Sequence, residues 1–215
     1  HCRQGVCVFD ELIVGLQDAR HRFRLACQSD ILGVEGARSY ASNFVSVLQS
    51  HFQALGLKPS NWFLAAVGGL GRGEMSFVSD VDLLFVYSRR LPGPVREAIQ
   101  SLVQAMWDGG FELGHMVSSQ SGLNALMKED FSVWTTCMQT KFIDGDRQLY
   151  GQWRQKLVQS RNPRQCKQFL QTLQQARQKR RAHYAESNYL LEPNIKEGLG
   201  GLRDLHSLRW CGLVF

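Results

Sequence analysis

The sequence predicts an α+β fold, in which a small mixed sheet has helical layers before and after it along the chain. Three observations lead to this prediction. Two amphipathic segments open the chain, three short apolar segments occupy its middle, and a helical pattern returns from Ser121 onward. A chain of 215 residues can bury the core of one domain, or of one domain and part of another.

Residues 1–60 are expected to form an N-terminal helical layer. Apolar residues recur at every third or fourth position in residues 10–27 and again in residues 35–55. In the second segment they form one stripe, made of Ala37, Tyr40, Phe44, Leu48, Phe52 and Leu55. We therefore expect two helices, each of which buries one face.

Residues 61–145 are expected to form the core. Three short apolar runs there are bounded by Gly, Ser, Asp or Pro, as is typical of strands. We expect these strands near Phe63, Leu84 and Leu113, over residues 61–67, 80–87 and 111–117. Between the last two runs, a helical pattern begins at Pro94 and ends at Gly109 and Gly110, so a helix should back the sheet.

Residues 146–215 are expected to begin a helical domain that is incomplete in this chain. The helical pattern breaks at residues 144–146, at Pro163 and in residues 188–201. The chain starts with His1 and stops within "CGLVF" as a helical pattern is running. We therefore expect it to be a piece of a longer protein.

The net charge of +6 is compatible with an anionic partner such as a nucleotide. Much of the positive charge lies in residues 154–181, where apolar residues at helical spacing occupy one face and basic residues mostly the other. Such a pattern is typical of a solvated helix face. Contact with phosphate by some of these basic residues is the alternative.

The remaining composition excludes several classes of protein. No apolar run approaches the roughly 20 residues that span a bilayer, and the first residues lack the layout of a signal peptide. The six cysteines include no CxxC pair, which argues against a zinc site or a disulfide framework. We expect a protein of the reducing cytoplasm with no membrane partner.

A glycine-rich stretch, "GGLGRGEMSFVSDVDLLFVY", follows the first predicted strand. Its glycines, Gly68, Gly69, Gly71 and Gly73, do not match a dinucleotide-binding fingerprint, and the connection to the next strand is too short for a crossover helix. No Gly-Lys-Ser/Thr follows, which excludes a P-loop. The glycines form either another kind of phosphate cradle or a tight turn.

Two aspartates, Asp80 and Asp82, stand one residue apart where the second predicted strand begins. Alternate residues of a strand share a face, so the two carboxylates should project together and repel one another. Mg²⁺ prefers carboxylate oxygens together with substrate phosphates, and two such ions can share a carboxylate pair. The pattern predicts a magnesium site for phosphoryl chemistry, with an ordinary turn or exposed strand edge as the alternative.

In these residues the chain resembles the polymerase-beta-like nucleotidyltransferases, in which a strand, a Gly-Gly or Gly-Ser pair and an Asp-x-Asp strand form the active site. It resembles more narrowly the bacterial PII uridylyltransferase/uridylyl-removing enzymes. Two further segments carry this resemblance, "FELGHMVSS" in residues 111–119 and "NYLLEPNIKEGLGGLRDLHSLRW" in residues 188–210. The similarity runs from residue 65 to the end of the chain.

The resemblance implies transfer of UMP from UTP to a tyrosine hydroxyl of PII, a protein of nitrogen regulation, with release of pyrophosphate. It implies that Gly68 and Gly69 bind phosphate and that Asp80 and Asp82 bind Mg²⁺. In this family, separate domains remove the uridylyl group and sense glutamine. Because neither is present in this chain, we expect it to lack both properties.

Three further site residues follow from the resemblance. Arg72 either touches phosphate or braces the glycine loop through Glu74. Glu112 is the only acid in "FELGHMV", so it is the candidate for the third carboxylate that binds metal and helps to deprotonate the acceptor, with a surface or salt-bridged role as the alternative. His115, three residues on, should face the other side of a regular strand and is a weaker candidate.

The charged segment "EPNIKEGLGGLRD", residues 192–204, supplies the last candidate. Its proline and three glycines disfavour a helix, yet it is rich in charge. It could fold over the cleft and bring Lys196 to the triphosphate. Alternatively, Arg203 and Asp204 form ion pairs that attach the helical region to the catalytic sheet.

Two other functions stay open. The chain could be a catalytically idle module that binds a nucleotide or protein, although the intact aspartate pair argues against this. It could instead act on RNA, although it lacks the stripe of aromatic and basic residues on which single-stranded bases stack. We therefore expect UTP and PII, rather than a nucleic acid, as partners.

Overall fold

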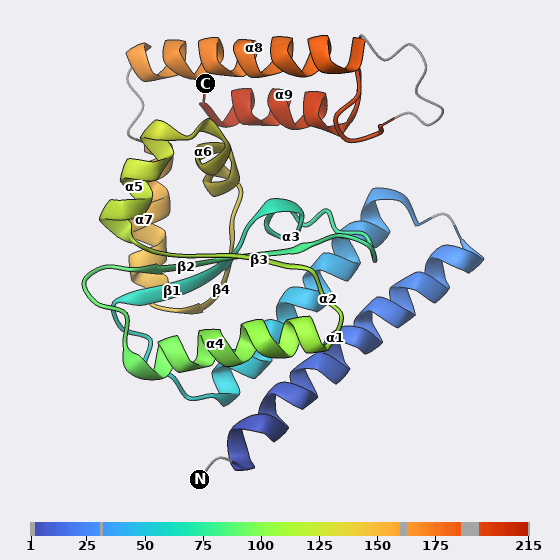
Figure 1. The fold of residues 1–215 in the computed structure, drawn as a ribbon, viewed down its shortest axis with the longest axis vertical. Coiled ribbons are helices and arrows are strands. Elements are labelled where there is room, and N and C mark those ends of the chain that lie inside the picture. Colours follow the sequence, from blue (N-terminus) through green and yellow to red (C-terminus); the bar gives the residue numbers. More distant parts are fainter. Residues whose placement is uncertain (1–2, 31, 160–162, 186–193, 215) are drawn as a thin grey trace. The chain divides into compact units, whose positions relative to one another are not determined.

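The computed structural model describes residues 3–30, 32–159, 163–185 and 194–214. It is an α+β protein, as predicted (Figure 1). The described helices are α1 (Arg3–Ser29), α2 (Gly33–Ala54), α3 (Gly68–Arg72), α4 (Gly93–Asp108), α5 (Gln120–Glu129), α6 (Phe131–Met138), α7 (Arg147–Gln159), α8 (Pro163–Ala185) and α9 (Leu202–Val214). The strands are β1 (Trp62–Ala66), β2 (Val81–Tyr87), β3 (Leu113–Ser119) and β4 (Lys141–Gly145). The chain divides into two compact units, His1–Trp153 and Arg154–Phe215.

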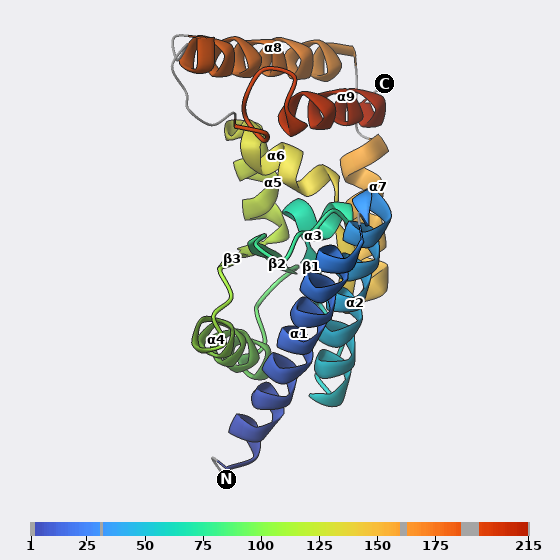
Figure 2. The same ribbon diagram turned by 90° about the vertical axis from the view of Figure 1, so that its right-hand side faces the viewer.

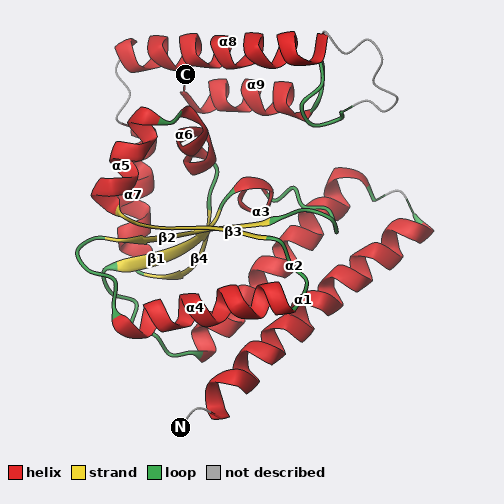
Figure 3. Cartoon of the chain, viewed as in Figure 1, coloured by secondary structure: helices red, strands yellow, loops and turns green. Residues whose placement is uncertain are grey.

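The sheet of the first unit is mixed, with the strand order β3-β2-β1-β4 (Figure 3). Strand β1 pairs antiparallel with both β2 and β4, while β2 runs parallel to β3. Antiparallel neighbours need only a short connection, which explains why the glycine-rich stretch between β1 and β2 contains no long crossover helix. The parallel pair is joined by α4, as parallel strands require.

One face of the sheet packs against α1, α2 and α4 (Figure 2). Trp62, Leu64 and Phe85 project from this face into a core that includes most of the predicted stripe of α2. The rings of Phe52 and Phe85 lie 6.4 Å apart, which joins α2 to the central strands. Each such buried apolar side chain contributes about 1.5–3 kcal/mol to stability, so these contacts fix the helices on the sheet.

The opposite face of the sheet is covered by α5 and by the first turns of α7 (Figure 1). The Phe63 ring lies 5.3 Å from the ring of Tyr150 and 5.3 Å from that of Trp153. Because β1 is covered on both sides, all five of its residues are buried. Asp82 alternates with Leu83 along β2 and therefore lies on this second face.

Strand β4 was missing from the sequence prediction, which read residues 121–143 as helical, and on this point the prediction was wrong. The strand has only five residues, and a bulge opposite Leu64 and Ala65 interrupts its register with β1. Only Ile143 of the strand is fully buried, so its sequence carries little of the apolar signal of a strand. Burial of β1 accounts for its presence, because the backbone groups on the free edge of β1 need hydrogen-bond partners.

The second unit contains α8 and α9, whose charged residues form ion pairs with one another. Arg180 of α8 donates to Asp204 of α9 at 2.5 Å, and Cys166 donates to the carbonyl of Val214. The basic side chains Arg164, Lys167, Lys179 and Arg181 are exposed. The start of α8 at Pro163 agrees with the break predicted there, while residues 188–193 of the predicted loop lie outside the described residues.

Within the described part of the chain, no helix combines the length and the apolar character that crossing a membrane requires.

Candidate active site

Asp82 is enclosed by two stretches of backbone. A Cβ atom placed on Gly114 would lie 2.5 Å from Oδ1 of Asp82, and one placed on Gly68 would collide with Oδ2 of the same carboxylate. Gly68 has a φ of +58°, in the left-handed region that favours glycine. A side chain at either position would displace the half-buried carboxylate from the place that it occupies here.

The glycine-rich stretch forms a compact turn whose first five residues make the short helix α3. The amide of Val67, just before it, donates to the carbonyl of Asp82 at 3.0 Å, which ties the turn to β2. A Cβ on Gly71 would lie 2.6 Å from the Gln139 carbonyl and 2.7 Å from that of Ala66. The turn is therefore packed against the ends of the sheet strands as well as against the aspartate.

Arg72 closes the turn through an ion pair. Its Nε atom lies 3.6 Å from Oε2 of Glu74, and both side chains are largely buried. The Glu74 amide donates to the carbonyl of Gly69 at 2.9 Å, so both ends of the turn are held together. This geometry provides the bracing contact that the sequence suggested for Arg72, and a phosphate contact by Arg72 stays a prediction.

Asp80 and Glu112 lie at the same end of the sheet as Asp82, and both are exposed. Asp80 immediately precedes β2, and Glu112 immediately precedes β3, just outside the strand to which the sequence assigned it. The Val81 amide donates to the Glu112 carbonyl at 2.8 Å, and Val81 pairs with Leu113 in the parallel register. If this register is extended by one residue before each strand, Glu112 lies opposite Asp80.

The carboxylates of Asp80, Asp82 and Glu112 do not by themselves form a set of metal ligands. Among the residues that the structure describes, no group of three or more His, Cys, Asp and Glu side chains is placed to hold a metal ion. Magnesium, however, is commonly held by one or two carboxylates together with substrate phosphates and water. Asp80 and Asp82, adjacent at one strand end, fit that donor set, and their role as metal ligands stays a prediction.

His115 and Gly114 lie on opposite faces of β3. His115 pairs with Leu83, on the face away from Asp82, and it is exposed. Gly114 was not among the predicted site residues, although a glycine inside a strand often marks the close approach of another group. That signal was present in "FELGHMV", and the group that approaches is the carboxylate of Asp82.

Lys196 belongs to the second unit, in a loop that folds back on the start of α9. The side chain of Asn194 accepts hydrogen bonds from the amides of Lys196 and Glu197 at 3.1 and 2.8 Å. The Lys196 carbonyl in turn accepts from the amide of Arg203 at 2.9 Å. The Lys196 side chain is exposed, and its contact with a triphosphate stays a prediction.

Ion pairs fix this loop. Arg203 donates to Glu197 at 2.9 Å, and Asp204 accepts from Arg180 and from the Gly200 amide. Partial burial alone would raise the pKa of Glu197, but the hydrogen bond and charge of Arg203 outweigh it and lower that pKa. Burial alone would also raise the pKa of Asp204. The hydrogen bonds from the Gly200 amide and from Arg180 outweigh this effect and lower that pKa. These partners of Arg203 and Asp204 lie within the second unit.

A small mixed sheet with carboxylates at the strand end next to a glycine-rich turn has the form of a polymerase-beta-like nucleotidyltransferase, the class that the sequence predicted. Comparison with known proteins gives a narrower result. The family model described as GlnD PII-uridylyltransferase matches residues 168–214. These residues lie in the second unit, so this match is independent of the aspartate site.

Several curated relatives match a larger part of the chain. The bifunctional uridylyltransferase/uridylyl-removing enzyme of Rhodospirillum rubrum is 38% identical over 149 residues, covering 67% of this chain and 16% of that protein. The enzyme of the same name from Caulobacter vibrioides is 36% identical over 147 residues, covering 68% and 16%. That from Bordetella avium is 38% identical over 152 residues, covering 71% and 17%.

These matches confirm the resemblance to the bifunctional uridylyltransferase/uridylyl-removing enzymes that the sequence motifs indicated. The matched part of the chain spans only 16% of the length of the first of these relatives.

Proposed function

We propose that this chain carries the nucleotidyl-transfer centre of a PII uridylyltransferase, which moves UMP from UTP to a tyrosine hydroxyl of PII. The observation that carries the proposal is the enclosure of the Asp82 carboxylate by Gly68 and Gly114, beside a glycine-rich turn. The similarity to the uridylyltransferases supports the choice of UTP and PII over other substrates.

The reaction is a displacement on phosphorus. The acceptor oxygen attacks the α-phosphorus of UTP, the bond to the β-phosphate oxygen breaks, and pyrophosphate leaves with the negative charge. Glu112, which is exposed at the same end of the sheet as Asp82, takes the proton of the acceptor hydroxyl. Gly68 and Gly69 have no side chains, so the backbone of the turn can approach the phosphates closely.

Asp80 and Asp82 hold magnesium ions in this proposal. When bound, magnesium would offset the charge on the phosphates and align the attacking and leaving oxygens. The chain's own contribution is rigidity. Gly68 and Gly114 fix the Asp82 carboxylate, and the Arg72–Glu74 pair keeps the turn in shape.

The proposal is tested by incubating the protein with labelled UTP or ATP, Mg²⁺, and either PII or RNA. We expect label from UTP to be transferred to PII, and a PII variant whose tyrosines are replaced by phenylalanine should stay unlabelled. Transfer to RNA would identify a different nucleotidyltransferase. No transfer to either acceptor, from a folded protein that still binds UTP, would identify an idle binding module.

A further inference from the structure

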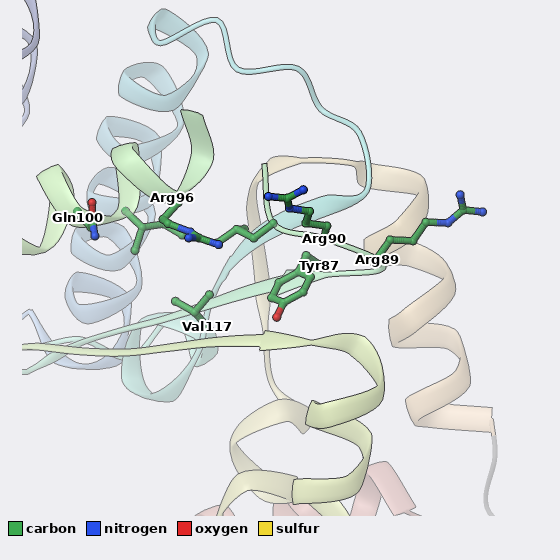
Figure 4. A pocket seen from close by; sticks show the side chains of 8 residues that line it. Tyr87, Arg89, Arg90, Arg96, Gln100 and Val117 are labelled. Atoms are coloured by element: carbon green, nitrogen blue, oxygen red, sulfur yellow. The ribbon is translucent and has the colours of Figure 1, made fainter. Parts of the chain in front are cut away.

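A pocket lies at the far end of β2 from Asp82 (Figure 4). Its volume is about 450 Å³, and its walls include Tyr87, Arg90, Leu91, Arg96, Ile99 and Val117. These residues come from the end of β2, the following loop, the first half of α4 and the outer strand β3. All of them belong to the first compact unit.

This pocket is separate from the candidate active site. Tyr87 stands five positions after Asp82 along β2, which corresponds to about 16 Å along an extended strand. Tyr87 packs against the core on the α4 side of the sheet, whereas Asp82 lies on the other side. A ligand small enough for one site therefore cannot reach the other.

The charge of the pocket is entirely positive. Arg89, Arg90 and Arg96 line it, and no lining residue is acidic. In the described part of the chain, no salt bridge is formed by any of these three arginines. Arg89 extends away from Arg96 in Figure 4, so Arg90 and Arg96 are the cations that face a ligand.

The beginning of α4 adds to this positive potential. Its first turn contains no acidic residue, and Pro92 at its N-cap provides no side-chain hydrogen bond to the first amides. The N-terminal end of a helix carries partial positive charge, which favours anions. Arg96 lies near this end of α4, so its positive charge and the partial positive charge of the helix both attract anions.

The other side of the pocket is apolar. Tyr87 and Leu91 are half-buried, Ile99 is buried, and Val117 is 40% exposed. Pockets of about 300–1,000 Å³ with apolar walls and a few polar groups are typical of small-molecule sites. The pocket thus offers a charged end for an anion and an apolar wall for a small ring or chain.

We propose that this pocket binds a small phosphate-bearing ligand, at a site distinct from that of nucleotide transfer. The forked guanidinium of arginine matches phosphate and can make two parallel hydrogen bonds to it. Arg90 and Arg96 together with the start of α4 supply more charge than a single carboxylate balances, which favours phosphate. The proposal does not depend on the proposed transfer activity.

Calorimetric titration of the whole chain in metal-free buffer with a chelator tests this proposal. The probes are inorganic phosphate, phenyl phosphate, and succinate as a dicarboxylate. We expect phenyl phosphate to bind severalfold more tightly than inorganic phosphate, because its ring contacts Tyr87 and Val117. We expect succinate to bind most weakly.

Variants locate the binding. Replacing both Arg90 and Arg96 by Gln should weaken binding of phenyl phosphate at least tenfold. Gln100→Glu, which places an acid one helical turn from Arg96, should weaken it without removing any cation. Arg38→Gln on the exposed surface of α2 is the matched control. Neither this variant nor Asp82→Asn should alter the binding of phenyl phosphate.

Four results would overturn the proposal. The first is unchanged binding in the folded double variant or in Gln100→Glu. The second is an equal loss in Arg38→Gln, which would indicate non-specific attraction. The third is tighter binding of succinate than of phenyl phosphate. The fourth is a loss in Asp82→Asn, which would place the phosphate in the candidate active site.

Discussion

The two compact units hold their functional candidates by different means. In the first unit, Asp82 lies between Gly68 and Gly114, where a side chain on either glycine would meet its carboxylate. In the second unit, the loop that carries Lys196 is held by ion pairs, such as that between Arg203 and Glu197. The first arrangement depends on shape and the second on charge.

This difference predicts how each unit fails. Close-packed sites tolerate added volume poorly, since neighbouring atoms cannot move far. Partly exposed ion pairs contribute modestly and depend on both partners staying charged. Added volume should therefore damage the first unit most, and altered charge the second.

The largest effect is expected from Gly114→Ala. Its methyl group would lie 2.5 Å from the carboxylate of Asp82, so either the strand or the aspartate must move. The atom that the methyl group would meet is the end of the Asp82 side chain, so the carboxylate can turn aside and Tm should change little. We also expect UMP transfer to fall below a tenth of the wild-type rate.

Gly151→Ala is the matched control for that change. Gly151 is exposed in α7, and a Cβ there would meet no atom within 4 Å. Alanine is favoured over glycine inside a helix by about 0.5–1 kcal/mol, so this variant should be slightly more stable and fully active. Full activity of Gly114→Ala would show that the position of the Asp82 carboxylate does not depend on the glycine.

Glu112→Gln should slow turnover at least tenfold and leave the KM for UTP within about twofold. General-base assistance is commonly worth about 10²–10⁴ in rate, and it acts on the chemical step rather than on binding. Steady-state kinetics with Glu35→Gln, another exposed acid, as the control would measure this. A change in KM alone would assign Glu112 to binding or to the surface.

Lys196→Ala should raise the UTP concentration needed for half-maximal rate about tenfold, as expected for loss of a charge-assisted contact. The Tm of this variant should stay unchanged, because the exposed Lys196 side chain takes no part in the ion pairs that hold the loop. Lys58→Ala serves as the exposed control. Early melting with normal UTP binding would make the loop a structural brace and remove Lys196 from the site.

Acid should affect the two units in different pH ranges. Burial lowers the pKa of His51 from 6.5 to about 4, so between these values the unfolded state binds the extra proton. The stability of the first unit should therefore fall as pH drops from 6.5 towards 4. Glu197 and Asp204 have lowered pKa values, so their contribution is lost only as pH falls below their ordinary values of 4.5 and 3.8.

Hydrogen exchange followed separately for each unit as a function of pH measures this effect, which is the smallest of those predicted. His51→Gln should flatten the response of the first unit between pH 6.5 and 4 and leave the second unit unchanged. Equal loss of protection in both units above pH 5 would contradict these assignments.

The sequence predicted the elements with strong periodicity and missed those that depend on their neighbours. The stripe of α2 and the apolar runs of β1 and β2 show in the sequence because burial imposes a regular spacing. Strand β4 has only five residues and forms because β1 needs a second partner, which no local pattern records. The short helix α3 lay within a stretch that the sequence read only as a cradle or turn.

The same distinction applies to the candidate site. The spacing of Asp80 and Asp82 was visible because both belong to one strand end. Gly114 is 32 positions beyond Asp82, and only the parallel register of β2 and β3 brings it to the carboxylate. Contacts between segments far apart in the chain depend on topology, and the local spacing of residues does not predict topology.

Asp80 and Asp82 form the proposed centre of nucleotide transfer, and their conversion to asparagine tests this role most directly. Rates of UMP transfer to PII would be compared for wild type, Asp80→Asn and Asp82→Asn, each with a thermal melt. We expect each variant to transfer at less than a tenth of the wild-type rate, with Tm unchanged or raised because the repulsion between two neighbouring carboxylates is removed. A rate above a tenth of wild type in either folded variant would contradict the account.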